Sequence, residues 1–124
     1  MSFKPTLKKL KALSDRSRLR AFMLLLGFDE ICSCFFADFF KFSAPTISRH
    51  LSLLADAGFI KGRKEGRWVY FSLNRKSKYL ENWIGLLEKS IMQKELIADR
   101  KKMQKILESG CGNVANCKKG SKRK

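Results

Sequence analysis

The chain has 124 residues, and its 27 Lys and Arg residues against 11 Asp and Glu residues give a formal net charge of +16. This length suits one domain with a single core, and the charge favours a polyanionic partner such as nucleic acid. The longest apolar run, at residues 21–28, is far shorter than the roughly 20 residues that span a bilayer. The N-terminal stretch also lacks the order of a signal peptide. The composition therefore predicts a cytoplasmic protein with no membrane segment.

Three helices are predicted in the first third of the chain. Apolar residues at helical spacing predict a short amphipathic helix at residues 6–13. A second helix starts after the capping residues 14–15 and ends at Gly27. A third helix begins at Asp29 or Glu30, and its phenylalanines recur at a spacing that points them into the core.

A fourth helix and a β-hairpin follow. Pro45 suits the first helical position, where its missing N–H would have had no partner, and it predicts a helix at residues 45–57. Residues 59–63 and 67–73 alternate enough to form two strands, with residues 65–66 as the turn between them.

One long helix is predicted at residues 77–107, because apolar residues recur there at helical spacing. About 30 residues at 1.5 Å each span about 45 Å, which is longer than a core of this size can cover. We expect the overhang to pack against a second subunit. The predicted order of elements, α-α-α-α-β-β-α, is the pattern of a mainly α winged helix-turn-helix.

The chain is predicted to have two regions. Residues 1–108 form a winged helix-turn-helix domain for DNA binding and dimerisation. Residues 109–124 have no apolar period and form a basic, flexible tail that contains Cys111 and Cys117. In a reducing compartment the four cysteines stay thiols unless oxidation or metal binding is their purpose, which favours ligands over structural disulfides.

The predicted DNA-reading helix offers short polar and cationic side chains, as contact with base edges in the major groove requires. Cations in the hairpin suit contact with phosphates beside the groove. The predicted DNA contacts are Ser43, Thr46, Ser48, Arg49, His50 and Ser52 in the turn and helix, and Lys61, Arg63, Lys64 and Arg67 in the hairpin. Alternatively, the charges are the solvated face of an ordinary helical protein. For His50, DNA contact and packing both stay open, because it borders the buried stripe.

Three runs of the sequence carry a specific resemblance: ALSDRSRLR, CSC and APTISRHLSLLADAGFIKGRKEGRWVYFSL. Together they closely resemble the arsenic-sensing branch of the ArsR/SmtB family of metalloregulatory repressors, over nearly everything from Leu10 to Leu73. The resemblance implies a homodimeric winged helix-turn-helix protein that binds double-stranded operator DNA and releases it when an inducer binds. It implies a repressor of an arsenic-resistance operon, not an enzyme, whose N-terminal and long C-terminal helices form the dimer.

Cys32 and Cys34 match the Cys-x-Cys at the start of the family's sensor helix. Trivalent arsenic, As(III), is soft and binds thiolates, typically three of them. No third cysteine follows closely, so Cys111 or Cys117 of either subunit could be the third ligand, or the site is two-coordinate. Residues two apart in an ideal helix point about 200° from each other, so we expect arsenite binding to unwind this turn and shift the reading helix.

Other functions stay open on the sequence. The thiols could form a disulfide and sense oxidants or persulfides, could bind cadmium or lead, or could be small buried apolar residues. A thiol oxidoreductase is disfavoured, because the Cys-x-Cys does not follow a predicted strand and no His or acid obviously pairs with it. An architectural DNA binder that uses charge alone would show equal affinity for operator and random duplex.

Overall fold

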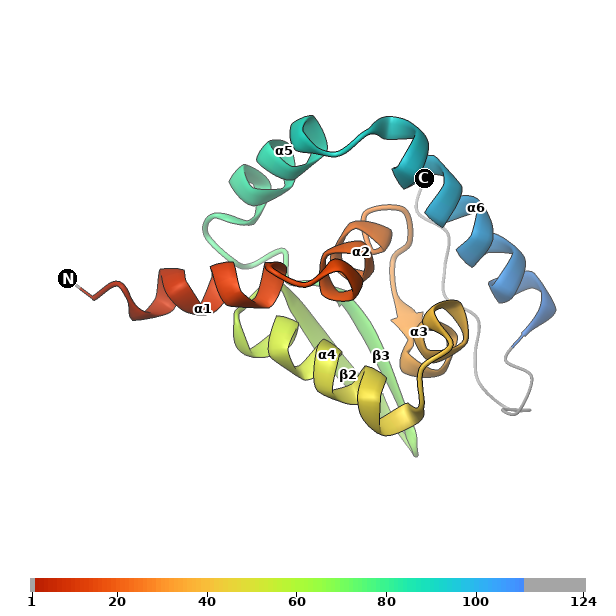
Figure 1. The fold of residues 1–124 in the computed structure, drawn as a ribbon. Coiled ribbons are helices and arrows are strands. Elements are labelled where there is room, and N and C mark those ends of the chain that lie inside the picture. Colours follow the sequence, from red (N-terminus) through yellow and green to blue (C-terminus); the bar gives the residue numbers. More distant parts are fainter. Residues whose placement is uncertain (1, 111–124) are drawn as a thin grey trace.

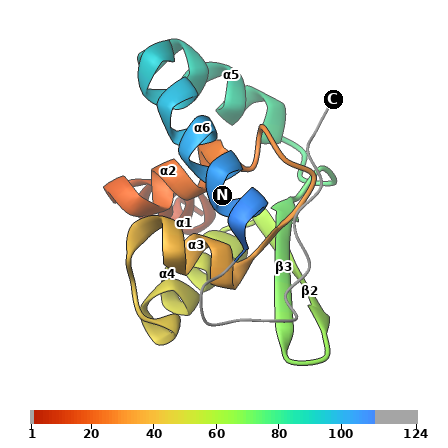
Figure 2. The same cartoon turned by 90° about the vertical axis from the view of Figure 1, so that its right-hand side faces the viewer.

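The computed structural model describes residues 2–110, which form helices and a small antiparallel sheet (Figure 1), and the view of Figure 2 shows the sheet to one side of the helices. The helices are α1 (Lys4–Leu13), α2 (Arg16–Leu24), α3 (Ser33–Phe40), α4 (Ala44–Asp56), α5 (Leu80–Ser90) and α6 (Gln93–Ser109), and the strands are β1 (Ile31–Cys32), β2 (Ile60–Glu65) and β3 (Trp68–Leu73). Within residues 2–110, no helix combines the length and apolar character needed to cross a membrane. The predicted mainly α winged helix-turn-helix architecture is confirmed.

Local capping sets the starts of α2 and α4. The Asp15 carboxylate accepts a hydrogen bond from the Arg18 backbone N–H (3.0 Å), and the Ser43 hydroxyl accepts one from the Thr46 backbone N–H (3.3 Å). Both caps supply an acceptor to an N–H group that has no partner inside the helix. Together they fix where the chain turns into each helix, although Pro45 occupies the second helical position and not the predicted first.

Phenylalanines fill the core between α2, α3 and the sheet. Phe35, Phe36 and Phe39 of α3 are at most 1% exposed. Phe22 of α2 is also buried, and its ring centroid lies 5.0 Å from that of Phe59. The remaining phenylalanine of α3, Phe40, was expected in the core but is only partly buried, because it lies at the end of the helix and stacks on Phe42.

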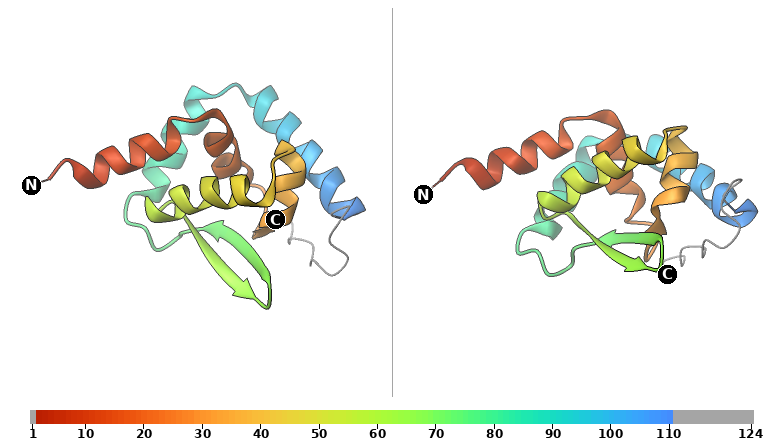
Figure 3. Two further views of the ribbon diagram at one scale, coloured as in Figure 1. Left: turned by 60° about the horizontal axis from the view of Figure 1, so that its bottom comes forward. Right: turned by 90° about the horizontal axis from the view of Figure 1, so that it is seen from below.

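The sheet has three strands in the order β1-β3-β2, all antiparallel neighbours. Glu65 pairs with Trp68, so the hairpin of β2 and β3 turns through Gly66 and Arg67, and not through residues 65–66 as predicted. Gly66 has φ 61°, and the first central position of a two-residue hairpin turn commonly needs such a left-handed conformation. The hairpin projects from the body beside α4 (Figure 3).

The start of α3 differs from its prediction. The chain does not enter this helix at Asp29 or Glu30; Ile31 and Cys32 first form β1, which pairs with Phe71 and Tyr70 of β3. Two residues are too few to show the alternation that marks a strand in a sequence. The correction matters because it places Cys32 in the sheet and Cys34 in the helix.

The single helix predicted at residues 77–107 is wrong. Ile91 and Met92 have extended backbones, with ψ of 138° and 131°, and they divide the segment into α5 and α6. The break lets α6 fold back past α2 and α3 (Figure 2), where Leu96, Met103 and Leu107 are buried against the core. The apolar stripe is therefore covered by the same chain, and no overhang is left to argue for a second subunit.

Candidate functional site

The outer face of α4 is polar and open. Ile47, Leu51 and Leu54 are at most 2% exposed and hold the inner face of the helix against the core. The predicted contacts Ser43, Thr46, Ser48, Arg49 and Ser52 are all exposed. Ser43 also uses its hydroxyl in the cap of α4, where it lies 2.9 Å from the Thr46 hydroxyl. This face can therefore offer hydroxyl groups and one guanidinium to a groove of a duplex.

His50 connects α4 with α2. Arg18 Nη1 lies 3.1 Å from His50 Nδ1 and donates to it, which makes this ring nitrogen an acceptor. The His50 ring also stacks on Phe42, with 5.5 Å between ring centroids. Arg18 donates in addition to the backbone carbonyls of Ala12 and Lys11. The contacts that the structure describes for His50 thus belong to packing, and its contact with DNA stays a prediction.

Asp15 lies beside this contact, with its carboxylate 4.0 Å from His50 Nδ1. Burial acts to raise the pKa of Asp15, but the hydrogen bond from the Arg18 backbone N–H and the positive charge of Arg18 outweigh it, so the pKa lies below its usual value of 3.8. Sequence reasoning identified Asp15 as a cap but missed its position next to the reading helix, because residues 15 and 50 carry no local signal of contact.

The hairpin carries the predicted phosphate contacts. Lys61, Lys64 and Arg67 are exposed, and the Arg67 guanidinium lies 5.8 Å from the centroid of the Trp68 ring. Lys64 and Arg67 lie at or next to the turn of the projecting hairpin, whereas Lys61 lies at the other end of β2. All three could contact phosphates if α4 enters a groove.

Arg63 is also exposed, but two carboxylates already bind it. Its Nη2 lies 2.6 Å from Glu30 Oε1 and its Nε 3.3 Å from Glu30 Oε2. Its Nη1 donates to Glu65 Oε2 at 2.9 Å. The hydrogen bonds with Glu30 and then with Glu65 raise the pKa of Arg63 still further above its already high value. The positive charge of Arg63 is therefore compensated in the DNA-free protein.

Cys32 and Cys34 lie next to each other where β1 passes into α3. Cys32 is fully buried, Cys34 is partly buried, and their Sγ atoms are 3.2 Å apart. The expectation that the two side chains point about 200° apart is wrong, because it treated both residues as helical. Cys32 is the N-cap of α3 and has an extended backbone, with φ −66° and ψ 143°.

The two sulfurs are close enough together for one ion to bond both of them. An ion that bonds sulfur at about 2.3 Å, as Zn²⁺ does, can reach two sulfurs up to about 4.6 Å apart. The observed 3.2 Å between the Sγ atoms of Cys32 and Cys34 lies within that limit, so no helical turn has to unwind. Among residues 2–110 no three Cys, His, Asp or Glu side chains are grouped closely enough to hold a metal ion. The other two candidate ligands, Cys111 and Cys117, lie outside the residues that the structure describes.

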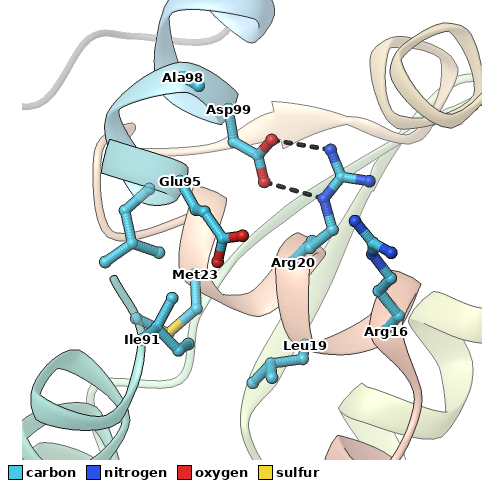
Figure 4. Close-up of a pocket in the computed structure, with 9 residues that line it drawn as sticks. Arg16, Leu19, Arg20, Met23, Ile91, Glu95, Ala98 and Asp99 are labelled. Atoms are coloured by element: carbon cyan, nitrogen blue, oxygen red, sulfur yellow. Dashed lines mark hydrogen bonds and ion pairs between the residues drawn. The ribbon is translucent and has the colours of Figure 1, made fainter. Parts of the chain in front are cut away.

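A cavity of about 410 Å³ lies elsewhere, between α2 and α6 (Figure 4). At its edge Arg20 Nε and Nη2 donate to Asp99 at 2.9 and 2.7 Å, and these hydrogen bonds raise the pKa of Arg20. Leu19, Met23 and Ile91 supply apolar walls. Neither thiol nor any predicted DNA contact lines this cavity, so it is separate from the candidate site.

Comparison with known proteins identifies the family. A family model described as "Bacterial regulatory protein, arsR family" matches residues 15–61. The arsenical resistance operon repressor of Escherichia coli (strain K12) is 33% identical over 124 residues, which cover 98% of this chain and 97% of that protein. This chain belongs to the arsR family. As an arsR-family protein it is a DNA-binding transcriptional regulator and, as predicted, not an enzyme.

Two further similarities bear on this arsR-family chain. A cadmium resistance transcriptional regulatory protein, the CadC homolog of Staphylococcus aureus, is 37% identical over 91 residues, covering 73% of this chain and 71% of that protein. The homodimeric winged helix-turn-helix DNA-binding domain of Mb0332 from Mycobacterium bovis superposes with a TM-score of 0.59. It is 21% identical, and the match covers 71% of this chain and 79% of that domain, so this likeness concerns the fold.

Family membership, and not the position of the thiols, is what excludes the oxidoreductase. The argument that the Cys-x-Cys does not follow a strand is wrong, because Cys32 is the last residue of β1. The strand is short, and among residues 2–110 it pairs with β3 alone. The conclusion stands on the regulators to which the chain is similar.

Proposed function

We propose that this chain represses an arsenic-resistance operon, binding its operator and releasing it when arsenite binds Cys32 and Cys34. The observation that carries the proposal is the distance of 3.2 Å between the two Sγ atoms. The thiols lie where β1 passes into α3, and α3 leads in turn into α4. As(III) is a soft centre that prefers thiolate ligands. Similarity to the Escherichia coli arsenical resistance operon repressor over nearly the whole chain supports this choice of inducer.

The proposed DNA interface combines α4 with the hairpin. Thr46, Ser48, Arg49 and Ser52 face base edges, and the hairpin cations contact phosphates on either side. The exposure of these side chains and the projection of the hairpin beside α4 support this arrangement (Figure 3). The high net charge adds attraction to any duplex, so specificity has to come from the face of α4.

The proposed inducer site starts from two thiolates. One arsenic atom bridges Cys32 and Cys34 without unwinding α3, and a third thiolate from Cys111 or Cys117 of either subunit completes the coordination, or the site stays two-coordinate. Cadmium is the second candidate inducer, since the CadC homolog of Staphylococcus aureus is similar over 73% of this chain. Oxidation is the third candidate signal, because the two sulfurs would have to approach only from 3.2 Å to about 2.05 Å to form a disulfide.

The proposed protein is a homodimer. Phe3, Leu7 and Leu10 on or next to α1 are 82%, 52% and 48% exposed, and Leu86 of α5 is 59% exposed. Apolar side chains exposed together in this way are typical of an interface. The family resemblance implies a dimer through the N-terminal and long C-terminal helices, and we place the contact on α1 and on α5, the first part of that C-terminal segment. Residues 1–108 are the folded domain, residues 109–124 are its tail, and the protein is located in the cytoplasm.

The test measures the affinity for operator DNA by fluorescence anisotropy at fixed salt, with and without arsenite, after the native chain has selected an operator from a random duplex pool. Coupling factors are typically about 5- to 150-fold, so arsenite should raise the Kd of the native chain by at least about fivefold. Cys32→Ser/Cys34→Ser should abolish this rise. Cys111→Ser/Cys117→Ser abolishes it only if the tail supplies a ligand.

Two results would contradict the proposal. If arsenite leaves the Kd of the native chain unchanged while cadmium or mild peroxide raises it, the inducer is wrong and the fold senses another signal. If the chain binds random duplex as tightly as the selected operator, with the same dependence on salt, it binds DNA through charge alone.

A further inference from the structure

Glu30 joins the thiol region to the hairpin. It lies directly before β1, two residues from Cys32, and both of its carboxylate oxygens accept hydrogen bonds from Arg63 of β2, at 2.6 and 3.3 Å. The Glu30 side chain is 31% exposed and that of Arg63 is 52% exposed. A bidentate pair of carboxylate and guanidinium constrains orientation as well as distance. The two segments are therefore held in a defined position relative to each other.

The sheet makes a second connection between the same two segments. Tyr70 of β3 pairs with Cys32 on one side and with Arg63 on the other. The Arg63 guanidinium also lies 4.8 Å from the centroid of the Tyr70 ring. The thiol residue, the central strand and the hairpin cation thus lie in one row across the sheet, and the Glu30 carboxylate joins the two ends of that row.

We propose that Glu30 is a positioning residue that couples the thiol pair to the DNA-binding hairpin through Arg63. This inference rests on the proposed function and specifies a route for its regulation. β1 has only two residues, so few backbone hydrogen bonds hold it, and a ligand that moves the Cys32 sulfur displaces β1 together with Glu30. Arg63 follows Glu30, and the hairpin changes its position relative to α4.

The coupling acts in both directions. DNA phosphates near the hairpin attract the Arg63 guanidinium and compete with the Glu30 carboxylate for it. Operator binding then loosens or shifts β1 and changes the access to the thiols, as the reciprocity of coupled binding requires. The α3–α4 connection on which the sequence-based mechanism relied is not needed for this route.

The chain offers a matched control in Glu65. It binds the same guanidinium, through Nη1 at 2.9 Å, and Glu65→Gln removes the same charge as Glu30→Gln. Glu65 belongs to β2 itself, however, and it has no place in β1 or in the segment before it. A loss of coupling in Glu30→Gln but not in Glu65→Gln therefore separates the proposed link from a general change of charge near the DNA.

The first experiment determines the coupling factor, which is the ratio of the operator Kd with arsenite to that without it, by fluorescence anisotropy at fixed salt. Since native coupling factors are typically about 5- to 150-fold, Glu30→Gln should lower the factor about threefold or more, while Glu65→Gln keeps the native factor. Arg63→Gln should lower it as Glu30→Gln does, and the double variant should lower it no further, because two residues that act through each other are not additive. Equal factors in native chain and Glu30→Gln would overturn the proposal.

The second experiment needs no arsenite and so distinguishes this proposal from the choice of inducer. Iodoacetamide alkylation of Cys32 and Cys34 is followed by peptide mass mapping, with and without operator DNA. Operator DNA should change the rate of alkylation of the two thiols about threefold or more in the native chain and in Glu65→Gln, but not in Glu30→Gln. If arsenite has no effect on the native chain and these rates behave as expected, the inducer is wrong and the coupling through Glu30 stands. If DNA changes the rates equally in all three chains, or in none of them, the coupling through Glu30 is refuted.

Discussion

At the residue scale, Asp15 caps α2 and lies beside the only histidine of the chain. Its carboxylate accepts from the Arg18 N–H at 3.0 Å, and Arg18 in turn donates to His50 of α4. A side chain that looks like a simple cap in the sequence thereby helps to fix the reading helix. Its charge should matter to stability, since its pKa is lowered in the folded protein.

Asp15→Asn tests this role of charge. Asn caps a helix about as well as Asp, so the variant loses the charge and keeps the cap. Because the folded-state pKa of Asp15 lies below its usual 3.8, the charge stabilises the fold above that pH, and the benefit is lost as the pH falls through the lower folded-state pKa. The Asp15 side chain is about a third exposed, so its charge contributes little. The free energy of unfolding of the native chain should exceed that of the variant by less than about 1 kcal/mol at pH 6, and by less still at pH 3.

Urea unfolding followed by circular dichroism at the two pH values measures that difference. A gap in unfolding free energy between native chain and Asp15→Asn that is the same at pH 6 and pH 3 would show that the charge of Asp15 contributes nothing, and that only the shape of the cap matters.

Single residues of the site were predictable to different degrees. The exposed face of α4 followed from periodicity, because every predicted contact on it except His50 is exposed. The bond between Glu30 and Arg63 joins residues 33 positions apart, and the contact between Arg18 and His50 joins residues 32 apart. Such pairs have no local pattern, since the fold and not the spacing brings them together.

At the element scale, helix starts and turns were located to within a few residues, but β1 and the break between α5 and α6 were missed. Caps and glycines mark α2, α4 and the hairpin in the sequence itself. At the break, Ile91 and Met92 are apolar residues that neither end a helix nor favour a turn. The burial of Leu96 and Met103 against α2 and α3 decides the break, and that is a tertiary effect.

The end of α3 supports a second prediction. Lys41 is exposed and has φ 60° and ψ 41°, a left-handed conformation that costs an L-residue about 1 kcal/mol. Lys41→Gly removes this cost at the price of a more flexible unfolded chain, so it should raise the free energy of unfolding by about 0.5–1 kcal/mol. Lys41→Ala retains the cost and serves as the control. Urea unfolding in which the Gly variant is less stable than the Ala variant would contradict the assigned conformation.

At the scale of the whole molecule, most of the large exposed apolar side chains lie on elements other than α4 and the hairpin. The predicted DNA contacts lie on α4 and the hairpin, whereas several of the exposed apolar side chains lie on or next to α1 and α5. The sequence argument for a dimer relied on an overhanging helix that does not exist, because α6 folds back onto its own core. The exposed residues of α1 and α5 now carry the dimer proposal.

Leu7→Lys tests the proposed dimer. Leu7 is 52% exposed, burying a leucine contributes about 1.5–3 kcal/mol, and a two-fold interface contains two copies of it. Placing a cation there should raise the dimer dissociation constant by at least about 100-fold. Ile97→Lys on α6, at a residue that is 44% exposed, should leave the dimer intact. Light scattering after size-exclusion chromatography measures the molar mass of each variant in solution. Equal molar masses for the native chain and Leu7→Lys would refute the interface on α1.

The unequal burial of the two thiols has a kinetic consequence. Cys34 is partly exposed, whereas Cys32 has 0% exposure beneath the pairing of β1 with β3. In the proposed inducer site, a thiol-seeking molecule therefore meets Cys34 first and completes its second bond only when β1 opens locally. The capture is a two-step process whose second step depends on how often the sheet edge opens, and not on how often the molecule arrives. For the proposed inducer site, this predicts a response time that is set within the protein by the lifetime of a two-residue strand.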